Sequence, residues 1–213
     1  MTGPPVGSVI VSDPARPRAV PPSSSPSGDA NPVTVAARPD LPARWPAVVR
    51  LELERRHAEM LADVGGGRHE RVLDLGRADH RSVLRQALDQ GLDVGQAGSY
   101  DAVVTVAGLA RFADLGAALS VVASLLAPDG VVMAVEPGFR PGAMGVLSAS
   151  LGALLAPARG VHLARDLPAT VRLSGLTVTD VERFTMPTLI WPLRSFVQLR
   201  AERFATALPK APR

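Results

Sequence analysis

Three short and nearly continuous apolar runs divide the middle of the chain, at residues 72–75, 102–107 and 131–136. Runs of this length without polar interruption are typical of strands buried on both faces of a parallel sheet. Residues 81–92 and 115–126 lie between these runs and repeat apolar positions at helical spacing. Strands that alternate with helices predict an α/β domain whose parallel strands are joined by right-handed crossovers.

The C-terminal third of the chain has a different pattern. Residues 143–156 are small and apolar and predict a helix over one end of the sheet, and residues 166–174 predict a further helix. Residues 177–186 and 195–204 alternate polar and apolar side chains, which is the pattern of strands with one solvated face. We expect them to close the sheet as its last pair of strands.

The N-terminal region has the composition of a tail. Residues 1–43 contain ten prolines and no periodic apolar face, so we expect them to be disordered. Residues 45–64 then alternate apolar and charged positions at helical spacing, and a run of three glycines ends this predicted helix. The predicted organisation is a tail at 1–43, one α/β domain at 44–207 and a flexible C-terminus at 208–213.

The distribution of charge and the absence of cysteine exclude several classes of function. The chain has 23 basic and 20 acidic side chains, a net charge of +3, and the two signs are interleaved. A nucleic-acid-binding domain concentrates basic residues on one face, so nucleic acid is not an expected partner. The absence of cysteine excludes disulfides and thiolate chemistry, and no apolar run reaches the about 20 residues of a membrane span. The N-terminus also lacks the apolar segment of a secretory signal, so we expect a soluble cytoplasmic protein.

An acid and a glycine follow the first apolar run. Asp74 ends the predicted strand, and Gly76 comes two residues later. In doubly wound α/β folds a nucleotide-like cofactor lies at this position, because a glycine lets the backbone approach the ligand closely. We expect Asp79 or Ser82 to cap the helix that follows.

Five sequence landmarks succeed one another along the predicted domain. They are VLDLG at 72–76, YDAVV at 100–104, LLAPDGV at 125–131, EP at 136–137, and GVHLAR at 160–165 together with GL and VERF at 175–184. In order and spacing they resemble the class I S-adenosylmethionine-dependent methyltransferases, specifically the group that acts on small molecules. The resemblance covers residues 45–205. It implies a Rossmann-like methyltransferase sheet that is mostly parallel and has an antiparallel closing strand.

The resemblance implies S-adenosylmethionine as the cofactor of an active protein. Asp74 and Gly76 match the acid and the first glycine of the family's cofactor motif, so they are the expected cofactor-binding residues. His162 precedes the region of the sixth family strand, which often borders the substrate pocket, and it is the substrate candidate. No catalytic side chain is expected, because methyl transfer from an activated sulfonium depends mainly on positioning. The four histidines are scattered and form no metal-ligand motif, so no metal site is expected.

Two features depart from the family's pattern. The next two glycine positions of the cofactor motif hold Ala78 and His80. The interval between Gly76 and Tyr100 has room for one helix and a turn, so we expect family strands two and three to be missing, with the acid that binds the ribose. The remaining family strands would lie in the order 1-4-5-7-6. Strand one then becomes an edge with unpaired backbone groups, where we expect a second copy, another protein or the N-terminal tail to bind.

Two functions are compatible with these observations. In the first, the chain is a degenerate methyltransferase-like domain that binds S-adenosylmethionine weakly or not at all and serves as an interaction protein or is vestigial. In the second, it is an active S-adenosylmethionine-dependent methyltransferase on a small, apolar molecule. The loss of the cofactor cradle favours the first.

Overall fold

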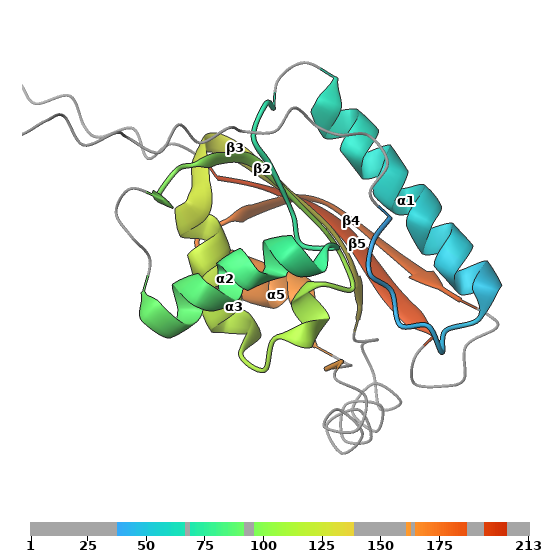
Figure 1. The fold of residues 1–213 in the computed structure, drawn as a ribbon. Coiled ribbons are helices and arrows are strands. Elements are labelled where there is room, and N and C mark those ends of the chain that lie inside the picture. The colour runs from blue at the N-terminus through green and yellow to red at the C-terminus, as the bar shows by residue number, and fades with distance from the viewer. Residues whose placement is uncertain are drawn as a thin grey trace, which may run out of the picture.

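A five-stranded mixed sheet with helices on both faces forms the centre of the protein (Figure 1). The computed structural model describes residues 38–66, 69–91, 96–138, 161–162, 165–186 and 194–203. The strands lie in the order β1-β2-β3-β5-β4. Their bounds are β1 Val72–Asp74, β2 Tyr100–Val106, β3 Leu126–Pro137, β4 Thr177–Thr185 and β5 Ser195–Glu202.

The pairing of these strands confirms the expected fold class. β1, β2 and β3 are parallel, and β5 runs antiparallel to both of its neighbours, β3 and β4. The strands follow the order 1-4-5-7-6 that the resemblance implies, with β1 at one edge of the sheet. The apolar runs form the parallel strands and the alternating segments form the closing pair, as the sequence predicts.

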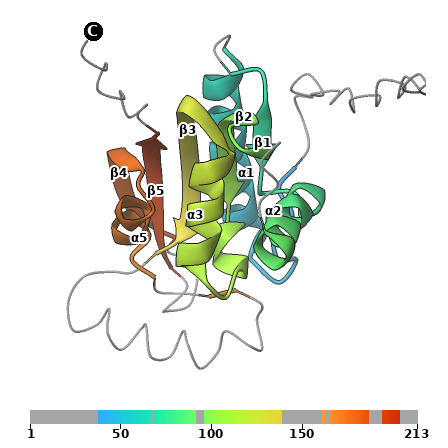
Figure 2. The same ribbon diagram turned by 90° about the vertical axis from the view of Figure 1, so that its left-hand side faces the viewer.

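Of the helices in the described ranges, three α-helices cover one face of the sheet and one covers the other. α2 (Ala78–Gln90), α3 (Leu115–Leu125) and α5 (Leu167–Leu173) lie on the first face. α1 (Ala47–Gly65) crosses the second, and Figure 2 shows α3 in front of the sheet with α1 behind it. The predicted helix at 143–156 and most of the predicted tail lie outside the described residues.

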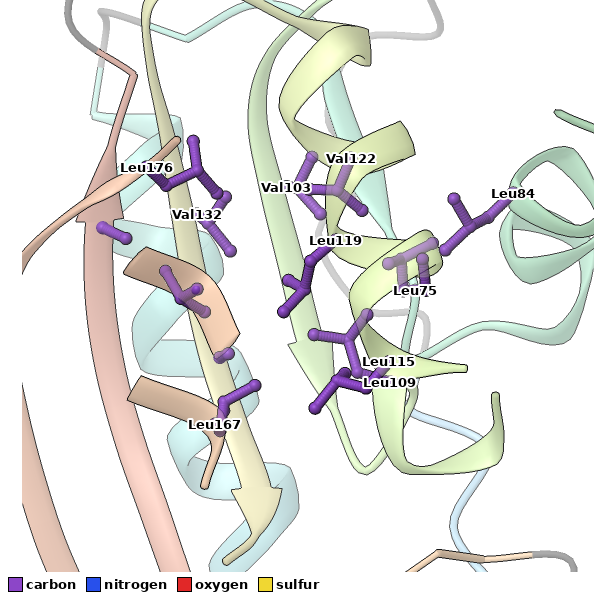
Figure 3. Close-up of a cluster of buried hydrophobic side chains, with 14 of the residues drawn as sticks. Leu75, Leu84, Val103, Leu109, Leu115, Leu119, Val122, Val132, Leu167 and Leu176 are labelled. Carbon is purple, nitrogen blue, oxygen red and sulfur yellow. The ribbon is translucent and has the colours of Figure 1, made fainter. Parts of the chain in front are cut away.

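Two hydrophobic cores result from this layering. In the first, side chains of α2 and α3, such as Leu84 and Leu119, pack with Val103 and Val132 of the sheet (Figure 3). In the second, α1 contributes Leu53, Met60 and other apolar side chains against the opposite face of β2 and β3. Of the helices described, none combines the length and hydrophobicity that a membrane crossing requires.

The shared face of α2 and α3 follows from the handedness of the chain. The path β1–α2–β2–α3–β3 moves across the sheet in one direction, from the edge inward. Two successive right-handed crossovers in the same direction place both connecting helices on the same face. This placement has a direct consequence for the carboxyl ends of the strands, where a ligand would bind.

The predicted start and cap of α2 are wrong. The helix begins at Ala78 rather than Arg81, and its N-cap residue, Arg77, makes no side-chain capping bond. The Ser82 hydroxyl instead donates to the Asp79 carbonyl oxygen inside the helix. The cause is the short turn after β1, in which the Arg77 N–H donates to the Asp74 carbonyl oxygen at 3.1 Å.

The free side of β1 is partly closed by the chain itself. β1 has three residues, and the backbone N–H of Asp74 donates to Nδ1 of His80 at 3.0 Å instead of to a strand. Very short strands and covered N–H groups are common ways of blunting a sheet edge. Any strand that adds to this edge would therefore have to pair with Val72 and not with the Asp74 N–H.

Candidate functional site

The buried polar side chains of the described residues gather at the carboxyl ends of β1, β2 and β3. His57, Asp74, Arg81, Thr105 and Glu136 are each at most 5% exposed. In parallel α/β sheets this end of the strands carries the ligand site. Buried polar groups need partners, so their hydrogen bonds show what the site is built to hold.

Asp74, one of the two expected cofactor-binding residues, has its partners inside the protein. Its Oδ1 accepts the backbone N–H of Gly76 at 2.9 Å and lies 3.0 Å from Nε2 of His57. His57 comes from α1, so this pair connects the helix on the second face to the end of β1. A lone histidine among the apolar positions of an amphipathic helix was the available sequence signal for this contact.

Gly76, the other expected cofactor-binding residue, is covered by residues 39–41, which we call the N-terminal strap. The Gly76 carbonyl oxygen accepts the backbone N–H of Asp40 at 2.8 Å. A Cβ added to Gly76 would lie 2.9 Å from Asp74 Oδ1 and 3.1 Å from Pro39 Cβ. The close approach that this glycine permits is thus used by the chain itself. The strap belongs to the packed protein, although its composition groups it with the predicted tail.

Arg81 completes the cover over the end of β1. Its Nη1 donates to the carbonyl oxygens of Leu75 and Gly76 at 3.1 and 2.8 Å. Its Nη2 donates to Oδ2 of Asp40 at 2.6 Å. Sequence reasoning missed this residue, although it shares the apolar face of α2 with Leu84.

The loop after β2 lies directly against the end of β1. Gly108 follows Ala107, whose φ is 53°, and leads into the 3-10 turn η2 (Leu109–Arg111). A Cβ added to Gly108 would lie 2.6 Å from Thr105 Oγ1, 2.9 Å from the carbonyl carbon of Leu75, and closer still to the Leu75 oxygen. The ends of β1 and β2 therefore meet without an intervening crevice.

Glu136 at the end of β3 holds this loop in place. Its Oε1 accepts the Thr105 hydroxyl at 2.7 Å and the Leu109 N–H at 2.9 Å, and its Oε2 accepts the Ala110 N–H at 3.0 Å. Burial raises the pKa of the Glu136 carboxyl, and these hydrogen bonds act in the opposite direction. Donors from the chain thus occupy both oxygens of the carboxyl.

His162, the substrate candidate, lies beside the same loop. Its backbone N–H donates to the Ala110 carbonyl oxygen at 2.7 Å, and Arg165 donates to the carbonyl oxygens of Phe112 and Ala113 at 2.7 and 2.6 Å. Burial, followed by the positive charge of Arg165, lowers the pKa of the His162 imidazole. The structure brings His162 to the end of the sheet that holds Asp74, which is compatible with the expected role but does not test it.

The arrangement of helices at the end of β1 differs from that of a ligand-binding switch point. A ligand crevice opens in α/β sheets at a switch point, where neighbouring strands send their helices to opposite faces. β1 is an edge strand, and α2 and α3 lie on one face, so the strand order does not reverse at this site. The strap and Arg81 then cover Gly76.

A hollow lies at the opposite, amino-terminal end of β2 and β3. It has a volume of about 480 Å³ and is lined by His69, Asp101, Ala127, Pro128, Asp129, Gly130, Val131, Arg200 and Glu202. Asp101 lies at the entrance of β2 and accepts from Arg71 Nη2 at 2.8 Å, which lowers the pKa of the Asp101 carboxyl. Within the described ranges no group of three side chains is arranged to hold a metal ion.

Comparisons with known proteins give similarity in fold only. No protein-family model matches the chain, and no curated protein matches its sequence. Among solved structures, an S-adenosylmethionine-dependent methyltransferase from Thermotoga maritima is 17% identical, over 51% of this chain and 58% of its own, with a TM-score of 0.37. One from Methanosarcina mazei is 14% identical, over 51% of this chain and 61% of its own, with a TM-score of 0.40.

The YcgJ protein from Bacillus subtilis is 12% identical, over 70% of this chain and 88% of its own, with a TM-score of 0.43. The chain thus spans less than two thirds of the length of the Thermotoga and Methanosarcina structures. Similarities of this size carry no statement about ligand or activity. The fold assignment rests on the sheet topology, and the function is a matter for proposal.

Proposed function

We propose that the chain is a methyltransferase-like domain that does not bind S-adenosylmethionine efficiently and acts through contacts with another protein chain. The contact between the loops after β1 and β2 is the main support. Gly108 approaches the Leu75 carbonyl group too closely to leave room for a side chain, let alone a cofactor. A cofactor cradle would need these two loops to diverge toward opposite faces of the sheet.

The proposed loss of the cofactor site has a cause in the sheet topology as well as in the loop sequence. Ala78 and His80 occupy two glycine positions, but the missing strands also remove the neighbour beyond β1 on which the ribose acid would stand. Restoring glycines would therefore not restore a crevice. The alternative, an active methyltransferase on a small molecule, requires the strap to leave and the two loops to separate.

Calorimetric titration with S-adenosylmethionine and with its demethylated product tests this proposal. We expect no binding to the full chain at ligand concentrations up to about 1 mM. A variant with the paired substitutions Ala78→Gly and His80→Gly provides the matched comparison, because it repairs the glycine pattern without adding strands. We expect that this variant also does not bind S-adenosylmethionine or its demethylated product.

Two results would contradict the proposal. Micromolar binding to the natural chain would favour the alternative, an active methyltransferase. Binding that appears only in the double-glycine variant would show that the loop sequence, rather than the strand order, had removed the cofactor site.

We propose that the chain associates with its partner through the edge of β1, and that this partner is a second copy of the chain. The free side of the strand presents Val72, while His80 takes the Asp74 N–H. Light scattering on the purified chain over a range of concentrations is expected to show a concentration-dependent dimer. A monodisperse monomer at high concentration would remove self-association and leave a different protein as the partner at this edge.

A further inference from the structure

Two arginines from different elements converge on the strap at the end of β1. Arg81 of α2 donates from Nη2 to Asp40 Oδ2 at 2.6 Å. Arg111 of η2 donates from Nη2 to the Asp40 backbone oxygen at 2.6 Å, and the same nitrogen lies 3.9 Å from Asp40 Oδ2. Asp40 is therefore held from two sides by guanidinium groups.

The two arginines are much less exposed than the aspartate. The side chain of Arg81 is 5% exposed and that of Arg111 is 22% exposed, whereas that of Asp40 is 52% exposed. Burying a guanidinium is costly unless it is paired, so these arginines form a fixed receptor within the fold. The carboxylate approaches the receptor from the solvent side, on a short segment.

The receptor has more positive charge and more donors than Asp40 satisfies. Arg111 Nε is buried and has no hydrogen-bond partner among the described residues. Burial, and next the positive charge of Arg81, lowers the pKa of Arg111, with Arg85 acting in the same direction. Asp40 and Glu136 oppose this, but Glu136 already accepts three hydrogen bonds elsewhere.

We propose that Arg81 and Arg111 form a carboxylate-binding site which the chain fills with its own Asp40, and that an external carboxylate competes with Asp40 for it. A carboxylate is the matching ligand because Arg81 Nη2 donates a charge-assisted hydrogen bond to a carboxylate oxygen here, and Arg111 Nη2 lies 3.9 Å from the same oxygen. The Asp40 carboxylate is the group that exchanges, because its side chain is 52% exposed and reaches the arginines from the solvent side. The site exists whether or not S-adenosylmethionine binds.

Chemical rescue by acetate tests the site directly. Asp40→Ala removes the side chain whose shape and charge acetate reproduces, and it leaves both arginines in place. We expect the melting temperature of this variant to rise saturably by about 4 °C when acetate replaces chloride at constant ionic strength and pH 7. The natural chain, in which the site is filled, is expected to show no such rise.

Asp63→Ala provides the matched control. Asp63 is 54% exposed and pairs with Arg200 at 2.8 Å, but Arg200 is itself 37% exposed. This variant loses a comparable surface ion pair without opening a buried receptor, so acetate should not stabilise it. Adding Arg81→Gln to Asp40→Ala should also abolish the acetate effect.

The proposal is overturned if Asp40→Ala responds to acetate no more than Asp63→Ala does, or if the response persists in the Arg81→Gln background. Asp40→Ser, a second variant that leaves the position of the carboxylate open, is measured beside Asp40→Ala in case the latter is unfolded in chloride. Recovery of the folded state in acetate by either variant supports the site. Failure of both to respond refutes it.

Discussion

Replacing Gly108 with alanine is expected to lower the free energy of unfolding by about 3 kcal/mol. The φ of Gly108 is −83°, which any residue can adopt, so the requirement for glycine comes from space alone. The new Cβ would lie 2.6 Å from Thr105 Oγ1 and closer to the Leu75 carbonyl oxygen. The backbone carbonyl group of Leu75, directly after β1, cannot rotate away as a side chain can, so the ends of β1 and β2 would have to move apart.

Urea denaturation of Gly108→Ala and Gly65→Ala provides the measurement. Gly65 ends α1, and a Cβ there would meet nothing within 4 Å, so this control is expected to be neutral or to gain up to about 1 kcal/mol. Equal stability of the two variants would mean that the loops after β1 and β2 do not touch. That outcome would also remove the main support for the absence of a cofactor crevice.

Glu136→Ala is expected to lower the free energy of unfolding by about 4 kcal/mol, which is a large share of the stability of a domain of this size. The carboxylate accepts two backbone N–H groups, from Leu109 and Ala110, and the Thr105 hydroxyl. A hydroxyl can turn to another acceptor, but the two amides are held by the 3-10 turn and would remain buried without one. Each unsatisfied buried donor costs about 1–3 kcal/mol.

Thr105→Val is the control for Glu136→Ala, because it removes only one of the three hydrogen bonds to the carboxylate. It removes one donor and leaves Glu136 with both amide bonds, so we expect a loss of about 1 kcal/mol by the same denaturation measurement. Glu136→Ala should therefore be several-fold more destabilising than Thr105→Val. Similar losses in the two variants would show that Glu136 does not hold the loop after β2.

The hydrophobic pattern predicted most of the elements because each of them has a local cause. The apolar runs became the parallel strands, and the alternating segments became β4 and β5, with one solvated face each. The boundaries of α2 were predicted less well. Its start at Ala78 depends on the turn between Asp74 and Arg77, which is a backbone contact that side-chain periodicity does not report.

The candidate site was located correctly in part. The sequence pointed to the corner of the fold at Asp74 and Gly76, and the structure places buried polar residues there. It did not reveal that His57 and Asp40 would occupy this corner. Both lie far from Asp74 or Gly76 in the chain, and such partners become visible only when α1 and the strap are folded against β1.

The sequence by itself determined the fold class and the succession of strands, because the period and length of each apolar segment specify its secondary structure. The shortened interval after Gly76 also allowed the strand order to be inferred, with β1 at the edge. Only the tertiary structure decided which face α2 covers and what fills the end of β1. The handedness of the crossovers places α2 beside α3 on one face of the sheet, and the loops after β1 and β2 come into contact. Asp74 and Gly76 consequently bind the protein's own side chains and backbone.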